Sequence, residues 1–293
     1  MVAPMQLFLL TSLTMIAFAA NSVLNRMALV DGGMDAMLFG ALRLGSGGLA
    51  LAVLVIAQRK GFGLGGWRRV LGVGALLLYI FGFSLAYGAL DAGLGALILF
   101  GMVQITMFSW AVFGGERPGA LRWVGASAAF GGLVWLLWPD GQLSLPLWHV
   151  VSMVLAGFGW GAYSLVGRGE DDPLQATAMN FLLAAPIAVA LAFITLSGSG
   201  PAPSIQPLGF GLAVLSGVVT SGMGYALWYR ILPALGATRA AVAQLTVPVI
   251  ALCGGVLLLG EGASLRFILA AALVLGGVLL SLIPTQVKSP KND

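Results

Sequence analysis

Long apolar runs, separated by short polar or Gly/Pro-containing breaks, make up almost the whole chain. A helix rises 1.5 Å per residue, so about 20 apolar residues cross the roughly 30 Å hydrocarbon core of a bilayer. Backbone groups in lipid must pair internally, so these runs indicate helices rather than an open sheet. The pattern predicts ten membrane-spanning helices, at residues 6–29, 34–57, 69–89, 93–113, 119–138, 147–167, 174–196, 207–229, 237–259 and 264–283.

Composition supports an all-α integral membrane protein. Hydrophobic residues are 59% of the 293 residues, charged residues are only 8%, and the mean hydropathy is +1.01. Soluble domains carry about 25% charged residues, and a chain with so few charges does not cover a water-exposed surface.

The positive charges predict the orientation of the chain, because Lys and Arg prefer cytoplasmic loops. With a cytoplasmic N-terminus, the outside loops hold only Arg26 and Arg266, and ten spans place the C-terminus in the cytoplasm as well. The net charge of +4 is therefore read as a topology signal, and it gives no reason to expect nucleic acid as a partner. The inside set is Arg59, Lys60, Arg68, Arg69, Arg117, Arg122, Arg168, Arg230, Arg239, Lys288 and Lys291.

One polar break occurs twice, as "GGERPG" and as "LLGEGASLR", with Glu116 and Glu261 145 positions apart. A Gly-Gly pair follows each Glu after 15 residues and a proline after 23 residues. These spacings predict two five-helix repeats, residues 1–140 and 141–293. Five is odd, so the second repeat is inverted relative to the first, a common construction of secondary transporters. We expect each Glu to cap the helix that follows it, where the helix dipole favours negative charge.

Three stretches carry a resemblance to a known family: "AYGALDAGLGALI", "GGERPGALRWVGASAAFGGLVWL" and "ALGATRAAVAQLTVPVIALCGGVLLLGEGASLRFILAAALVLGGVLL". Over its whole length the chain resembles the drug/metabolite transporter superfamily of the EamA type, and within it the YddG-like exporters of aromatic amino acids. The resemblance implies a five-plus-five fold, secondary transport and a bacterial inner-membrane location.

Aromatic and amide side chains deep in the predicted spans are the candidates for contact with a substrate. Rings would favour apolar or aromatic substrate groups, and an amide in hydrocarbon needs a polar partner. Ordinary packing of the rings and interhelical hydrogen bonds of the amides are the alternatives. The candidate substrate-binding residues are Asn21, Tyr79, Phe83, Phe100, Gln104, Met107, Trp160, Tyr163, Tyr225 and Gln244.

Arg43 is the one ionisable residue well inside a predicted span. A charge there must meet an acceptor, water or an anion. We interpret it as structural rather than as a ligand of a substrate carboxylate. Well inside the predicted spans there is no Asp, Glu, His or Lys, so we see no route for proton coupling.

The chemistry-bearing residues exclude several function classes. A single histidine, His149, and a single cysteine, Cys253, build neither a metal site nor a catalytic set, so we expect no cofactor and no enzyme. Phosphometabolite or nucleotide-sugar carriers call for several buried cations, and cationic-drug exporters call for a buried acid. A channel is a further alternative.

The predicted function is secondary transport, by alternating access, through a cavity between the two repeats. The expected cargo is a small amphipathic metabolite, with aromatic and other neutral amino acids as first choice, and the expected direction is export. Membrane lipid surrounds the protein, which we expect to be a monomer, with a dimer as the alternative.

Overall fold

A computed structural model describes residues 4–115, 118–138, 146–168, 170–197 and 206–281, and for residues 236–239 and 241 it describes the backbone alone. Over these ranges every regular element is helical. Glu116 lies outside the described residues, so its predicted capping role stays a prediction.

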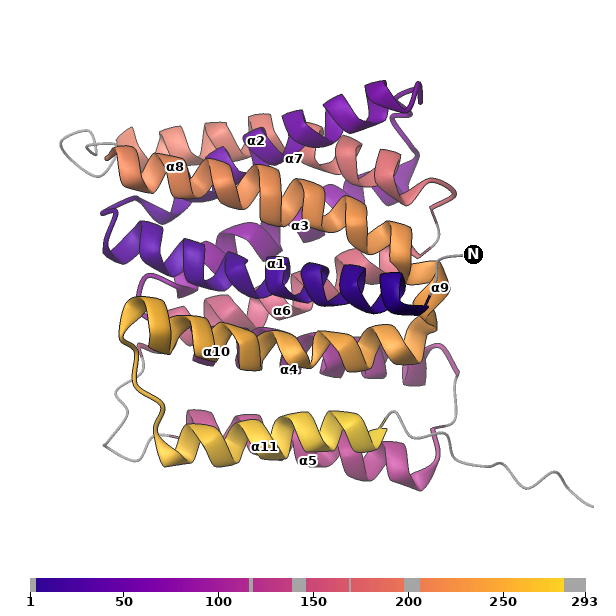
Figure 1. Cartoon of the computed structure of the whole chain (residues 1–293), viewed down its shortest axis with the longest axis vertical. Helices are drawn as coiled ribbons and strands as arrows, with labels where there is room; N and C mark the ends of the chain where they lie inside the picture. The colour runs from indigo at the N-terminus through magenta and orange to yellow at the C-terminus, as the bar shows by residue number, and fades with distance from the viewer. Residues whose placement is uncertain (1–3, 116–117, 139–145, 169, 198–205, 282–293) are drawn as a thin grey trace, which may run out of the picture.

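The helices run side by side along one common direction (Figure 1). Their bounds are α1 Pro4–Val30, α2 Ala36–Ala57, α3 Trp67–Ala86, α4 Ala92–Phe113, α5 Ala120–Leu137, α6 Leu147–Gly167, α7 Pro173–Ser197, α8 Pro207–Leu215, η1 Ser216–Met223, α9 Gly224–Gln244, α10 Thr246–Leu259 and α11 Leu265–Ser281.

Apolar helices lie at the approximate places of the predicted membrane spans, and nine or ten of the described helices can cross a bilayer. Among the described residues, nine helical segments are long and apolar enough to cross a bilayer, and α11 is a shorter apolar helix. One segment, Pro207–Leu235, combines α8, η1 and the first part of α9. The chain is therefore a multi-pass membrane protein.

The boundary between the eighth and ninth spans differs from the prediction. We expected a break after residue 229 and an uninterrupted helix over residues 237–259. Instead α9 continues through the Ala-rich stretch to Gln244, and the break falls at Leu245. Alanine is the strongest helix former, which keeps the first stretch helical. Pro248 cannot donate to the Gln244 carbonyl, and its ring clashes with that carbonyl, so α9 ends at Gln244 and α10 begins at Thr246, two residues before this proline.

The π-helix η1 is tied to the middle of α1. The hydroxyl groups of Ser216 and Thr220 both donate to the Asn21 carboxamide oxygen, and the Asn21 amide nitrogen donates to the Thr220 carbonyl at 3.4 Å. A π-helix is rare, appears mostly as a single turn inside an α-helix, and is frequent at functional sites. Asn21 therefore makes the interhelical hydrogen bonds that were one of its two interpretations.

Packing brings helices from the two halves of the sequence together. The main contacts are between α3 and α6, α2 and α7, α5 and α11, α4 and α6, and α1 and α10. The α5/α11 pair forms one side of the molecule, next to α4 and α10 (Figure 1). The remaining helices surround the centre of the bundle.

Close approach between these helices depends on glycine. A Cβ on Gly157 of α6 would lie 2.6 Å from the Met102 Cβ of α4, and a Cβ on Gly159 would lie 2.8 Å from the Tyr79 nitrogen of α3. Small residues of this kind let helix backbones come close in a membrane. The glycines of α6 therefore hold α3 and α4 near each other around the centre.

Candidate functional site

The two ends of the bundle differ in charge. The α2–α3 connection carries Arg59 and Lys60, and the first turn of α3, which begins at Trp67, carries Arg68 and Arg69. The α6–α7 connection lies at this same end, which we call the basic end. The end where α3 meets α4 and α10 meets α11 is called the opposite end.

A pocket of about 340 Å³ lies between α4, α6, α9 and the start of α7. This pocket, here called the vestibule, is bordered by the end of α6 and the start of α7 and so adjoins the basic end. Its volume falls within the range of small-molecule sites, roughly 300–1,000 Å³. Its lining includes Gln104, Met107, Trp160, Arg168, Tyr229 and Gln244.

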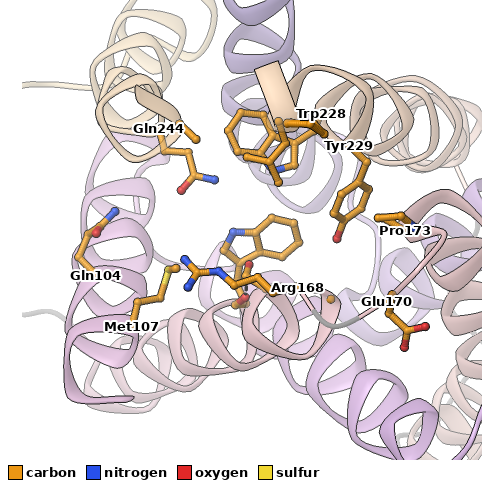
Figure 2. A pocket seen from close by; sticks show the side chains of 14 residues that line it. Gln104, Met107, Arg168, Glu170, Pro173, Trp228, Tyr229 and Gln244 are labelled. Atoms are coloured by element: carbon orange, nitrogen blue, oxygen red, sulfur yellow. Dashed lines mark hydrogen bonds between the residues drawn. The ribbon is translucent and has the colours of Figure 1, made fainter. Parts of the chain in front are cut away.

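Polar and aromatic groups lie on different sides of the vestibule (Figure 2). Gln104 and Gln244 lie on one side, and Trp228 and Tyr229 lie along the other. Arg168 extends into the pocket, whereas Glu170 lies at its margin. The vestibule thus offers amide groups, rings and one cation to a single small molecule.

A second cavity, here called the deep cavity, lies behind Trp160 and holds only about 10 Å³, room for about one water molecule. Trp160 lines both cavities. The deep cavity is enclosed by side chains from α1, α3, α4, α6 and α9, namely Phe18, Asn21, Ser22, Tyr79, Phe83, Leu99, Phe100, Trp160 and Tyr225.

The rings around Trp160 form one continuous cluster. The ring centroid of Trp160 lies 5.0 Å from that of Tyr79, 5.1 Å from Tyr225 and 5.8 Å from Tyr163. Such distances are typical of favourable aromatic pairs. Only 5% of Trp160 is exposed, so its indole is the partition between the vestibule and the deep cavity.

Nine of the ten predicted site residues line one of these two cavities. Gln104, Met107 and Gln244 line the vestibule, Trp160 lines both, and Asn21, Tyr79, Phe83, Phe100 and Tyr225 line the deep cavity. Tyr163 is not in either lining: it is buried, stacks on Trp160 and accepts a hydrogen bond from Asn180 at 3.4 Å. Whether these residues contact a substrate stays a prediction.

Several vestibule residues were not predicted from the sequence. Trp228 and Tyr229 lie at the end of the predicted span 207–229, where rings often form a belt at the membrane interface. The break expected after residue 229 placed them at a helix end. With α9 continuing to Gln244, both lie inside a helix and face the pocket. Pro233, which leaves the Tyr229 carbonyl without its helical donor, was the available signal that this turn is special.

The opposite end is closed by a polar network across the two halves of the chain. Both Glu261 carboxylate oxygens accept from the Ala92 backbone nitrogen, at 2.8 and 3.1 Å, and Oε1 lies 3.5 Å from Arg26 Nε. Arg26 also donates to the Tyr87 carbonyl at 3.1 Å and lies 3.7 Å from Asp91. The prediction that Glu261 caps the helix that follows it is wrong: it binds the first residue of α4, which offers the same dipole, while Ser264 caps α11.

Burial raises the pKa of Glu261 above its ordinary value of 4.5. The Ala92 amide and Arg26 act against this shift, and the nearby charge of Asp91 adds to it. Only 7% of the Glu261 side chain is exposed, which agrees with desolvation as the main cause.

This shift predicts a pH-dependent contribution to stability. A raised folded-state pKa means that the folded protein binds the proton more tightly than the unfolded chain. The contribution is complete below 4.5, the ordinary value, and is lost as pH rises through the folded-state pKa. We expect Glu261→Gln, which resembles the protonated carboxyl, to show a smaller rise in Tm than the native protein when pH falls from about 7 to about 5. An identical pH slope in both proteins would contradict this account.

The basic end carries two ion pairs that join the halves beside the vestibule. Lys60 Nζ lies 2.5 Å from Asp172, and Arg69 lies 3.4 Å from Glu170. Arg69 is buried and also donates to the Ala176 carbonyl at 2.8 Å. These pairs connect the α2–α3 segment to the α6–α7 segment, but the vestibule between α4, α6 and α9 is not covered by them.

Comparisons with known proteins agree with this architecture. A sequence model described as the EamA-like transporter family matches residues 147–283, which hold α6 to α11. The chain is 47% identical over 278 residues to the uncharacterized protein PA1977 of Pseudomonas aeruginosa, covering 94% of each chain. It is 23% identical over 256 residues to the uncharacterized transporter YoaV of Bacillus subtilis, covering 84% of this chain and 86% of that protein.

One solved crystal structure shares the fold. It superposes with a TM-score of 0.64 at 21% sequence identity and covers 92% of this chain and 98% of its own. The match to α6–α11, the apolar spans and the full-length likeness to relatives agree with one another. The chain therefore belongs to the EamA-like transporter family and is a multi-pass membrane transporter.

Proposed function

We propose that this transporter exports small amphipathic solutes, with aromatic and other neutral amino acids first, across the bacterial inner membrane by alternating access. The observation that carries the proposal is the position of Trp160, between an open vestibule and a closed deep cavity. A solute that enters the vestibule meets amide groups and rings, and only side chains separate it from the opposite end.

The state of the two ends supports alternating access. At the opposite end, the Arg26, Asp91 and Glu261 network holds the α1, α4 and α10 ends together. At the basic end the vestibule adjoins a region rich in Arg and Lys, which the positive-inside rule assigns to the cytoplasm. In this assignment the molecule is open to the cytoplasm and closed outward.

Equivalent helix contacts support two inverted five-helix repeats, residues 1–140 and 141–293. The contact between α3 and α6 has a counterpart between α1 and the α8–α9 span, and α4–α6 has a counterpart in α1–α10. The α2–α7, α4–α10 and α5–α11 pairs each join equivalent helices. Both polar breaks also contain a glycine with positive φ at the matching position, Gly115 at 90° and Gly260 at 65°.

The proposal is tested by uptake into proteoliposomes. We expect labelled phenylalanine to enter with saturable kinetics, and unlabelled tryptophan and leucine to compete with it. Unlabelled phenylalanine inside the vesicle should accelerate entry of the labelled phenylalanine. An alternating-access carrier returns from its inward-facing to its outward-facing state faster when it carries a solute than when it is empty. Entry that rises linearly with concentration and shows no trans-acceleration would indicate a channel. Absence of entry above protein-free vesicles would contradict the proposed cargo.

A further inference from the structure

Arg43 is a fully buried cation in the middle of α2, with 0% of the residue exposed. Its Nε donates to Ser221 Oγ at 2.8 Å and its Nη2 donates to the Tyr79 hydroxyl at 3.0 Å. Its guanidinium carbon lies 5.4 Å from the Tyr79 ring centroid and 5.1 Å from that of Phe83. The acceptors that Arg43 meets are therefore two side-chain hydroxyls deep in the bundle.

The charge of Arg43 has no counter-ion in the described part of the chain. The ion pairs found there involve Arg26, Lys60 and Arg69, all near helix ends. Nη1 of Arg43 is buried and has no hydrogen-bond partner among the described residues. Arginine stays protonated in proteins, and a buried charge without an opposite charge costs several kcal/mol. Two hydroxyls and two ring faces offset only part of that cost.

The guanidinium is directly connected to the wall of the deep cavity. Tyr79 and Phe83, the two rings beside it, both line that cavity. The Trp160 Nε1 of the same wall is buried and has no hydrogen-bond partner among the described residues. Each of these two N–H donors is unused, and a group that accepts from N–H donors and carries negative charge would satisfy Arg43 Nη1 in particular.

We infer that Arg43 binds the carboxylate of the transported solute in the deep cavity, so that the carrier selects amphipathic monocarboxylates, amino acids included. This inference rests on the proposed function and names the substrate class of that same site. The deep cavity holds only about 10 Å³, so the rings of Tyr79 and Trp160 must move as the solute passes from the vestibule. The carboxylate then replaces the Tyr79 hydroxyl on Nη2 and accepts from Nη1, in the bidentate geometry that guanidinium favours.

The test is a binding series in detergent with four probes of similar shape: 3-phenylpropionate, phenylalanine, phenylalaninamide and phenethylamine. Affinity is measured by thermal shift and by quenching of tryptophan fluorescence. We expect the two carboxylates to bind at least tenfold more tightly than the amide and the amine. Arg43→Gln should remove this preference by weakening the carboxylates about tenfold, while the amide and the amine bind as before.

Three further variants complete the test. Arg43→Lys keeps the charge but lacks the planar fork, so it should weaken the carboxylates by an intermediate factor even if Arg43→Gln does not fold. Arg59→Gln, at the exposed basic end, is the control that should leave the preference within about twofold. Arg168→Gln, which removes the cation that extends into the vestibule, tests whether the preference arises at the mouth instead.

The outcomes separate this inference from the proposed function. Equal affinity of the native protein for 3-phenylpropionate and phenethylamine would overturn the role of Arg43 while leaving transport of aromatic solutes intact. Loss of the preference in Arg168→Gln but not in Arg43→Gln would also overturn it, because the carboxylate would then be bound at the mouth. Failure of all four probes to bind, together with absent phenylalanine uptake, would overturn the proposed cargo and this inference together.

Discussion

Trp160→Ala is expected to raise the KM for an aromatic solute by about 30- to 150-fold, which corresponds to about 2–3 kcal/mol of lost contact energy. The indole lines both the vestibule and the deep cavity and contacts the rings of Tyr79 and Tyr225. Its removal takes away the one ring that lines both cavities among the described residues. The measurement is the concentration dependence of uptake in proteoliposomes containing equal amounts of folded protein.

Two matched variants separate this effect from lost stability. Truncation of a buried aromatic residue costs roughly 3–5 kcal/mol of stability wherever it occurs. Phe39→Ala removes a ring that is 0% exposed, in a small cluster with Ala28, Met34 and Ala213 away from both cavities. It should lower Tm without changing KM. Trp110→Ala, at a position that is 65% exposed on the bundle surface, should change neither. An unchanged KM in Trp160→Ala would remove this residue from the site.

Gly217→Val is expected to destabilise the protein by more than about 3 kcal/mol, the upper end for overpacking. A Cβ at Gly217 would lie 2.5 Å from the Arg43 carbonyl oxygen and 3.1 Å from the Arg43 Cα. These are backbone atoms of α2, which cannot rotate away, so η1 and α2 must separate. The separation would also disturb Ser221, which accepts from Arg43. The readout is Tm together with the fraction of monodisperse protein after extraction.

Gly211→Val in α8 is the matched control. It introduces the same β-branched side chain into the same membrane span, but a Cβ there meets no atom within 4 Å. We expect its Tm to stay within a few degrees of the native value. Equal destabilisation by both changes would mean that helix propensity, rather than the contact between η1 and α2, determines the result.

The membrane spans and most of the cavity residues could be predicted from the sequence, because the requirements of the bilayer apply to each short segment of the chain separately. An apolar run of about 20 residues has few other solutions in lipid. Polar side chains at mid-span avoid lipid, which is why residues such as Gln104 and Gln244 were predicted to face inward. Periodicity could place these side chains on helix faces, but it did not indicate that Trp160 separates two cavities.

Other features depend on contacts between distant segments and left no local signal. Glu261 follows α10 in the sequence, yet it binds the start of α4, because folding brings the α10–α11 connection against that helix end. From the sequence, Tyr163 and Trp160 were both candidates for substrate contact. In the structure the Tyr163 hydroxyl accepts from Asn180 of α7, and Tyr163 is in the lining of neither cavity. The partners of Arg43 come from α3 and η1, and no spacing in the sequence relates these three elements.

The π-helix η1 has a consequence for the aromatic face that follows it. A π segment holds one residue more than the α-helical turn it replaces, so its position sets the rotation of everything beyond it. Each residue of an α-helix turns the chain by about 100°. If the wider turn moved along the span past Tyr225, that ring would swing from the deep cavity toward a neighbouring helix, without any change in the length of the span. Asn21, through its bonds to Ser216 and Thr220, is the residue that holds this rotational setting.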